Sequence, residues 1–194
     1  MGDCCVRGFQ WDAAPKGREG KLAGRDCYIT GSNQNAAVMI IHDLFGFGGE
    51  SIPVEILNDQ SRWAELDLPS FLKRNAKDVR APEIFACAAE MKSNHPRTGI
   101  MGFCYGGWGA FQLAAKGLGL VDCVSVAHPT LLEREEMEKV GVPVQILAPE
   151  IDPQFTPDLK AFCERCDSYV GPGEKEGMER AKNASVMWFR QWLQ

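Results

Sequence analysis

The sequence predicts an α/β protein in which a mainly parallel sheet is flanked by helices. Four short apolar segments rich in Val, Ile or Met alternate with stretches of helical periodicity, and this alternation favours right-handed β–α–β crossovers. Continuous apolar runs of this length are typical of strands that are covered on both faces. The four predicted strands are Ala36–Ile41, Thr98–Phe103, Asp122–Ala127 and Val142–Ala148.

Helix candidates lie between and after these strands. Asp78–Lys92 carries apolar residues at near-helical spacing, and Pro82 is expected to limit its start. Thr130 and Glu133 have the spacing of a capping box in front of a predicted helix over Leu131–Lys139. The remaining helix candidates are Gly107–Lys116, Thr156–Ser168 and Glu176–Leu193. Residues 1–34 are punctuated by glycines and predict short antiparallel strands and turns.

Composition fits one globular domain over residues 1–194. The net charge of −5 and the lack of a basic block argue against a nucleic-acid surface. The longest apolar run, Ala36–Ile41, is too short to span a membrane. No signal in the sequence indicates an oligomeric state.

Eight cysteines are scattered along a chain whose start lacks the apolar core of a secretory signal, so we expect reduced thiols and a cytoplasmic location. Cys163 and Cys166 form a CxxC pair, but a zinc site needs a second pair at suitable spacing. We therefore expect no metal and no other cofactor.

The most informative segment is Gly102–Gly107, with the sequence Gly-Phe-Cys-Tyr-Gly-Gly. It joins a predicted strand to a predicted helix, and small-x-nucleophile-x-small in that setting is the pattern of a nucleophile elbow. The glycines allow a turn too tight for side chains, and the helix start behind Cys104 favours a thiolate. Cys104 is therefore the candidate nucleophile for acyl transfer. The alternatives are a buried structural cysteine, a phosphate-binding turn, and a redox or thiol-binding protein that uses Cys104.

With this elbow, the sequence resembles the dienelactone hydrolase family of α/β-hydrolases. Further blocks that carry the resemblance are His42-Asp43-Leu44-Phe45-Gly46, Ala127-His128-Pro129 and the segment from Leu147 to Pro153. The resemblance implies an α/β-hydrolase-like sheet in which the four strands are neighbours in sequence order. It also implies Cys104 as nucleophile, Asp152 as the triad carboxylate, and the backbone N–H groups of Leu44 and Tyr105 as the oxyanion hole.

The chain also departs from the family pattern. The family histidine lies in a His-Gly-Phe segment before the final helix, whereas here no histidine follows His128. The strand and helix that usually follow the first motif are missing as well. Two contiguous segments are absent, so the domain is expected to be truncated relative to the family. Such losses expose sheet edges.

Three histidines remain. We expect His95 at the surface, at the end of the sheet opposite Cys104, because it precedes the elbow strand. His42 and His128 each follow a predicted strand, so both are expected at the catalytic edge beside Asp43. The favoured interpretation is that His42, Asp43 and His128 line the substrate site. The less favoured alternative is that His128 acts as a substitute general base.

The leading hypothesis is a cofactor-free hydrolase of small esters or lactones that acts through a cysteine nucleophile. The alternative is a catalytically impaired pseudoenzyme or truncated isoform of a dienelactone hydrolase-like protein. A triad without its imidazole typically loses several orders of magnitude in rate, although a cysteine suffers less than a serine because some thiolate forms unaided.

Overall fold

The computed structural model describes residues 14–43, 56, 59–65, 67–148 and 175–194. Its main sheet has four parallel strands in the order β3-β4-β5-β6, with no other strand between any two of them. The strands are β3 (Ala36–Ile41), β4 (Arg97–Phe103), β5 (Cys123–Ala127) and β6 (Val144–Leu147). The predicted fold class and strand order are therefore confirmed, and the ends of the strands differ from the predictions by at most two residues.

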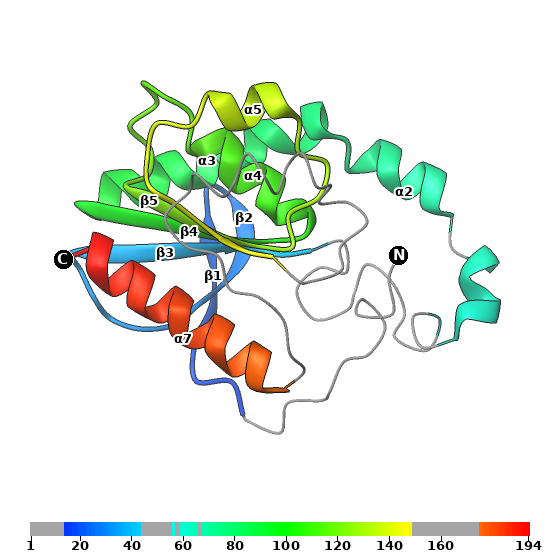
Figure 1. The fold of residues 1–194 in the computed structure, drawn as a ribbon, viewed down its shortest axis with the longest axis horizontal. Coiled ribbons are helices and arrows are strands. Elements are labelled where there is room, and N and C mark those ends of the chain that lie inside the picture. The colour runs from blue at the N-terminus through cyan, green and yellow to red at the C-terminus, as the bar shows by residue number, and fades with distance from the viewer. Residues whose placement is uncertain (1–13, 44–55, 57–58, 66, 149–174) are drawn as a thin grey trace.

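Helices cover both faces of this sheet (Figure 1). On one face lie α3 (Lys77–Asn94), α4 (Tyr105–Leu113) and α5 (Arg134–Glu138), of which α4 packs directly on β3, β4 and β5. On the other face α7 (Lys175–Trp192) packs on β5 and β6. Gly99 in β4 lets the Phe189 ring of α7 approach the sheet closely, because a Cβ at position 99 would lie 2.8 Å from that ring.

The core sits between β4–β6 and the helices on one face. Ile100, Val124 and Val126 are completely buried, as are Ala110 and Ala114 at the helical layer. Strands β4, β5 and β6 are buried along almost their whole length, which confirms that they are covered on both faces. Burial of apolar side chains on these strands and on the helices that cover them stabilises the fold.

The prediction that Ala36–Ile41 is covered on both faces is wrong for the described residues. Ala37, Met39 and Ile41 pack against the core, whereas Val38 and Ile40 on the opposite face are 40% and 65% exposed. Strand β3 pairs only with β4 among the described strands, so it forms an edge of the sheet. A continuous apolar run does not by itself distinguish a central strand from an edge strand.

The N-terminal prediction of short antiparallel strands is confirmed for the residues that the structure describes. Strands β1 (Arg18–Leu22) and β2 (Arg25–Ile29) form a hairpin that is a separate sheet. Its two-residue loop, Ala23 and Gly24, has positive φ at both positions, which matches the twist of tight hairpins. The hairpin rests on α3 rather than on an edge of the main sheet.

Two helix predictions need correction. Helix α3 begins at Lys77, five residues before Pro82, so that proline lies inside the helix and does not limit its start. The capping box is formed by Glu133 and Glu136 at the start of α5, rather than by Thr130 and Glu133. Positive φ at Leu131 keeps the chain out of helical geometry immediately after Thr130.

Of the remaining described helices, α4 and α7 were predicted, and two short elements precede α3. Ala181, Ser185, Trp188 and Trp192 lie on the inner side of α7, as the periodicity predicts. The η2 turn (Gln60–Glu65) and α2 (Leu68–Arg74) precede α3, and Asp67 caps α2 by accepting the Ser70 N–H. The predicted helix over 156–168 lies outside the described residues. Among those that are described, no helix is both long and apolar enough to cross a bilayer.

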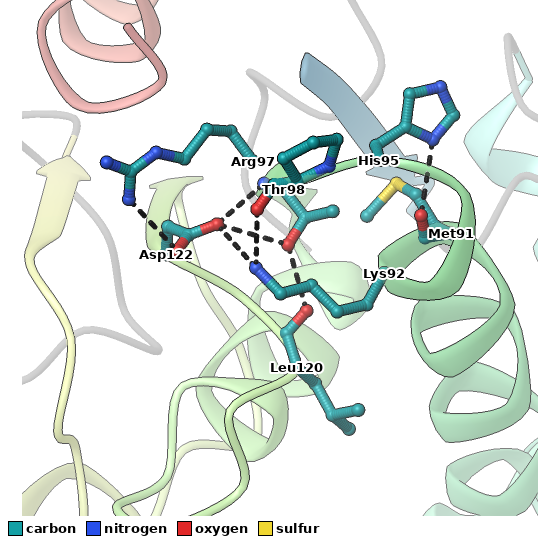
Figure 2. A network of polar contacts seen from close by, with 8 residues as sticks. Met91, Lys92, His95, Arg97, Thr98, Leu120 and Asp122 are labelled. Atoms are coloured by element: carbon teal, nitrogen blue, oxygen red, sulfur yellow. Dashed lines mark hydrogen bonds and ion pairs between the residues drawn. The ribbon is translucent and has the colours of Figure 1, made fainter. Parts of the chain in front are cut away.

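A polar cluster fixes the amino end of β4 (Figure 2). The Asp122 carboxylate accepts the Thr98 N–H at 2.7 Å and the Lys92 ammonium at 2.9 Å. The Arg97 guanidinium lies 3.5 Å away, and the Thr98 hydroxyl donates to the Leu120 carbonyl. Partial burial raises the pKa of Asp122, but the Thr98 N–H, Lys92 and Arg97 outweigh it and hold the pKa below its ordinary value.

Asp122→Asn should lower the free energy of unfolding at pH 7 by about 1–3 kcal/mol, because Lys92 and Thr98 lose a charged acceptor. The pKa of this carboxyl is depressed in the folded state. Its contribution is therefore present above the unfolded pKa near 4 and is lost as pH falls through the lower folded pKa. Urea unfolding of the wild type and of Asp122→Asn, at several pH values from 7 to 3.5, measures the difference in their free energies of unfolding.

The difference in free energy of unfolding between wild type and Asp122→Asn should become smaller as the pH falls. Asp26→Asn is the matched control, because Asp26 is 90% exposed in its ion pair with Lys21 and should change stability little. A gap of constant size across this pH range would contradict the assignment of the stabilisation to the Asp122 charge.

Candidate functional site at the carboxyl edge of the sheet

Cys104 occupies a strained turn between β4 and α4. Its φ is 51° and its ψ is −114°, a combination that non-glycine residues rarely adopt. It is the N-cap of α4, and its carbonyl accepts the Gly107 N–H at 2.9 Å. The predicted strand–turn–helix setting of Cys104 is thus present, with the backbone distortion expected at a nucleophile elbow.

The glycines beside Cys104 allow backbone segments to approach closely. A Cβ on Gly106 would collide with the Ile41 carbonyl oxygen and would lie 2.7 Å from the His42 carbonyl oxygen. A Cβ on Gly102 would collide with the Gly106 carbonyl and lie 2.8 Å from the Cα of Gly107. The sequence argument that this turn is too tight for side chains is therefore supported by its geometry.

Contacts from neighbouring helices hold the first turn of α4. The Tyr105 hydroxyl donates to the Asn75 carbonyl at 2.9 Å, and the Trp108 indole N–H donates to Glu136 at 3.0 Å. Lys77 binds the same Glu136 carboxylate and lies 5.5 Å from the Trp108 ring centre. The Tyr105 N–H lies in the first turn of the helix, where backbone donors lack intrahelical acceptors.

Other predicted site residues follow neighbouring strands at the same edge. His42 and Asp43 come directly after β3, and His128 comes directly after β5. Because the carboxyl ends of parallel strands lie at one edge of the sheet, these residues lie at the same edge as Cys104. Leu44 and Asp152 lie outside the described residues.

The three histidines differ in setting. His42 is exposed and its Nδ1 lies 2.7 Å from the Asp43 carbonyl oxygen, so Nδ1 carries the hydrogen and donates. His128 is half-buried, has a positive φ of 37°, and donates its N–H to the Leu147 carbonyl. His95 caps α3 at the opposite end of the sheet, as predicted, although it is half-buried rather than at the surface.

The proximity of Thr130 to Cys104 was not predicted from the sequence. The Thr130 Oγ1 lies 3.7 Å from the Cys104 Sγ, and the Thr130 N–H donates to the Cys104 carbonyl at 3.1 Å. The capping-box pattern assigned Thr130 to a helix start and not to the site around Cys104. Its position in the sequence could have indicated this proximity, because Thr130 is the third residue after β5, which pairs with the elbow strand β4.

Two of the other described cysteines, Cys123 and Cys87, have a different environment. Cys123 is buried inside β5, and burial, assisted by the nearby Asp122 charge, raises the pKa of its thiol to about 12. Burial also raises the pKa of Cys87, whose thiol contacts the Leu22 carbonyl. Neither thiol is poised to react as a thiolate near neutral pH. The Cys163–Cys166 pair lies outside the described residues, and no cluster of potential metal ligands is present among those described.

A cavity of about 690 Å³ lies elsewhere, between β6 and the second half of α7. Gln145, Trp188, Arg190 and Trp192 are among its lining residues, and Cys104 is not. The indole N–H groups of Trp188 and Trp192 are buried; that of Trp188 faces the Cys123 thiol, and that of Trp192 lacks a hydrogen-bond partner in the part of the chain that is described. Neither the cavity nor these indoles belong to the elbow.

Comparison with known proteins agrees with this geometry. The model of the dienelactone hydrolase family matches residues 58–169, a range that contains the elbow. The hydrolase pyvD of Aspergillus violaceofuscus is 22% identical over 244 aligned positions, which cover 98% of this chain and 96% of pyvD.

Solved structures show the same fold. A dienelactone hydrolase from Anabaena variabilis superposes with a TM-score of 0.62 at 15% identity, covering 92% of this chain and 97% of that one. The α/β hydrolase MGS-M1 from a deep-sea metagenome gives 0.50 at 13% identity, covering 93% and 99%. Because the family model spans more than half of the sequence, this chain belongs to the dienelactone hydrolase family and has an α/β-hydrolase-like fold.

Proposed function

We propose that this protein is a cysteine hydrolase of small esters or lactones whose acyl-enzyme turns over slowly. The observation that carries the proposal is the strained backbone of Cys104 at the start of α4. Strain of this kind costs about 1–3 kcal/mol and persists where the surrounding structure imposes it, which is common at catalytic positions. A buried structural cysteine does not require such a conformation.

The chemistry follows from the position of the thiol. The Cys104 thiolate attacks the carbonyl carbon, and the Tyr105 N–H is placed to stabilise the developing oxyanion. The carbon–oxygen bond to the leaving group breaks, the alkoxide takes a proton from water, and a thioester remains. Water then cleaves the thioester to give the acid and restores the thiol. A reducing cytoplasm would keep Cys104 available for this cycle.

The family resemblance supplies the rest of the proposed site. Asp152 would be the triad carboxylate, and the Leu44 N–H would be the second oxyanion donor. His42, Asp43 and His128 would line the substrate site, which their place at the edge beside Cys104 supports. No step in this scheme uses a metal or another cofactor.

Slow turnover is proposed because the family histidine is missing from the sequence. All three histidines lie at or before His128, and the alignment with pyvD extends over 244 positions although this chain has 194 residues. The longer alignment supports a chain shortened by internal segments. Deacylation requires a base to activate water, so it should be the step that suffers most.

Mixing the protein with an activated short-chain ester should release at most one equivalent of leaving group in a burst, followed by little turnover. Stopped-flow absorbance measures the burst, and mass spectrometry of the protein should show the acyl group on Cys104. Cys104→Ala should abolish both signals. Cys104→Ser should greatly reduce the burst, because a serine without a base is a far weaker nucleophile.

Three results would change this proposal. Rapid multiple turnover that disappears in His128→Ala would make His128 the general base of a competent enzyme. Turnover that survives Cys104→Ala would show that the elbow is not the active site. Absence of both burst and acylation in the wild type would leave a pseudoenzyme as the better description.

The strain at Cys104 gives a separate prediction about stability. Cys104→Gly should be more stable to urea than Cys104→Ala by about 1 kcal/mol, because glycine adopts positive φ without steric cost. The matched pair Cys123→Gly and Cys123→Ala should show the opposite order, since Cys123 lies inside a regular strand. Equal stability of both Cys104 variants would contradict the strain.

A further inference from the structure

The segment between β5 and α5 lies against the elbow. Thr130 in this segment places its hydroxyl oxygen 3.7 Å from the Cys104 sulfur, in a geometry where either atom can donate the hydrogen. Thr130 itself is half-buried, so its hydroxyl is partly screened from water. This contact joins residues 26 positions apart in the sequence.

Backbone hydrogen bonds fix where the Thr130 side chain lies. The Cys104 N–H donates to the Ala127 carbonyl, and the Thr130 N–H donates back to the Cys104 carbonyl, each at 3.1 Å. On the other side, the His128 N–H donates to Leu147 in β6 at 3.0 Å. The turn is therefore held both by the elbow and by the next strand, and the approach of Thr130 to Cys104 follows from the backbone.

Packing restricts the same turn further. Pro129 is buried against Gly107, where a Cβ would lie 2.7 Å from the proline Cβ. Positive φ values at His128 and Leu131 bend the chain on either side of Pro129 and Thr130. These contacts hold the backbone of Thr130 beside the elbow, so its hydroxyl lies near the sulfur. A surface threonine with a chance contact would have none of them.

We propose that Thr130 is a positioning residue for the Cys104 nucleophile, whose hydroxyl donates a hydrogen bond to the thiolate. This inference rests on the proposed role of Cys104. When Cys104 is a thiol, its S–H can donate to the hydroxyl oxygen, and when it is a thiolate, the hydroxyl rotates and donates to sulfur. Thr130 is not a base: its proton stays on oxygen, and the thiol proton leaves to water.

Stabilisation of the thiolate has a defined effect in a protein that lacks the family histidine. A hydroxyl donor raises the fraction of Cys104 that is ionised, and it orients the sulfur for attack. It cannot activate the water for deacylation, because a neutral hydroxyl is a very weak base. The arrangement therefore assists formation of the acyl-enzyme and leaves its breakdown unassisted.

The test measures alkylation of Cys104 by iodoacetamide against pH, followed by mass spectrometry of the Cys104 peptide in the full-length chain. Thr130→Val removes the hydroxyl at similar volume and should lower the rate about 3- to 10-fold near pH 7, with an upward shift of the profile by about half to one pH unit. Thr130→Ser should restore the wild-type profile. The rate at high pH should be nearly unchanged.

Cys87 provides the internal control, because its peptide reports alkylation of a half-buried thiol on α3 in the same samples. Its profile should be the same in all variants. Thr130→Ala is the second variant, and its profile should move as that of Thr130→Val does. If Thr130 had only a structural role, all three variants at position 130 would lose thermal stability. The pH dependence of Cys104 alkylation would then not shift selectively.

The outcomes separate this inference from the proposed function. An ester burst in the wild type together with superimposable profiles for Thr130→Val, Thr130→Ala and wild type would overturn the role of Thr130 alone. A shifted profile without any ester burst would support the hydrogen bond to the thiolate and count against the hydrolase. Failure of Thr130→Ser to restore the profile would also overturn the role of the hydroxyl.

Discussion

The close packing of the α4 amino terminus against the ends of β3 and β4 is the constraint on which the rest of the structure depends. Gly106 lies so near the Ile41 and His42 carbonyls that no side chain fits between them. This approach brings α4 onto the sheet and forces Cys104 into its positive-φ conformation. The helix then buries Trp108, Phe111 and Leu113 almost completely. Apolar burial of that extent offsets a local strain of about 1–3 kcal/mol.

Strand β4 is fixed at both of its ends by different kinds of interaction. At the amino end, the Asp122 carboxylate joins the Thr98 backbone to the Lys92 ammonium. At the carboxyl end, close backbone packing and the hydrogen bonds between Cys104 and the turn after β5 take over. A strand held in this way positions the group that follows it within narrow limits. Rigidity of this kind suits the proposed nucleophilic role of Cys104, because such attack depends on the alignment of sulfur and carbonyl carbon.

Strand β3 forms an edge of the sheet and carries exposed apolar side chains. Val38 and Ile40 are exposed on the face opposite the core, and the β1–β2 hairpin stands apart from the main sheet in the described part of the chain. Edge strands with exposed apolar side chains favour association between chains. The elbow follows the next strand, β4, and packs against the carboxyl end of β3 through Gly106.

The sequence by itself determined the strands and the location of the elbow, whereas the order of the strands was expected from the family resemblance. Short apolar runs and helical periodicity reflect burial that acts locally along the chain, and the glycines around Cys104 reflect a steric requirement of one turn. Only the tertiary structure decided that Val38 and Ile40 are exposed, because burial of a strand depends on which neighbours cover it. Only the tertiary structure brought Thr130 to Cys104, since that contact arises from the pairing of β4 with β5 and from backbone bonds across the turn. The physical reason is that a sequence pattern records the environment of each residue, whereas distances between side chains on different strands are fixed by how those strands pack.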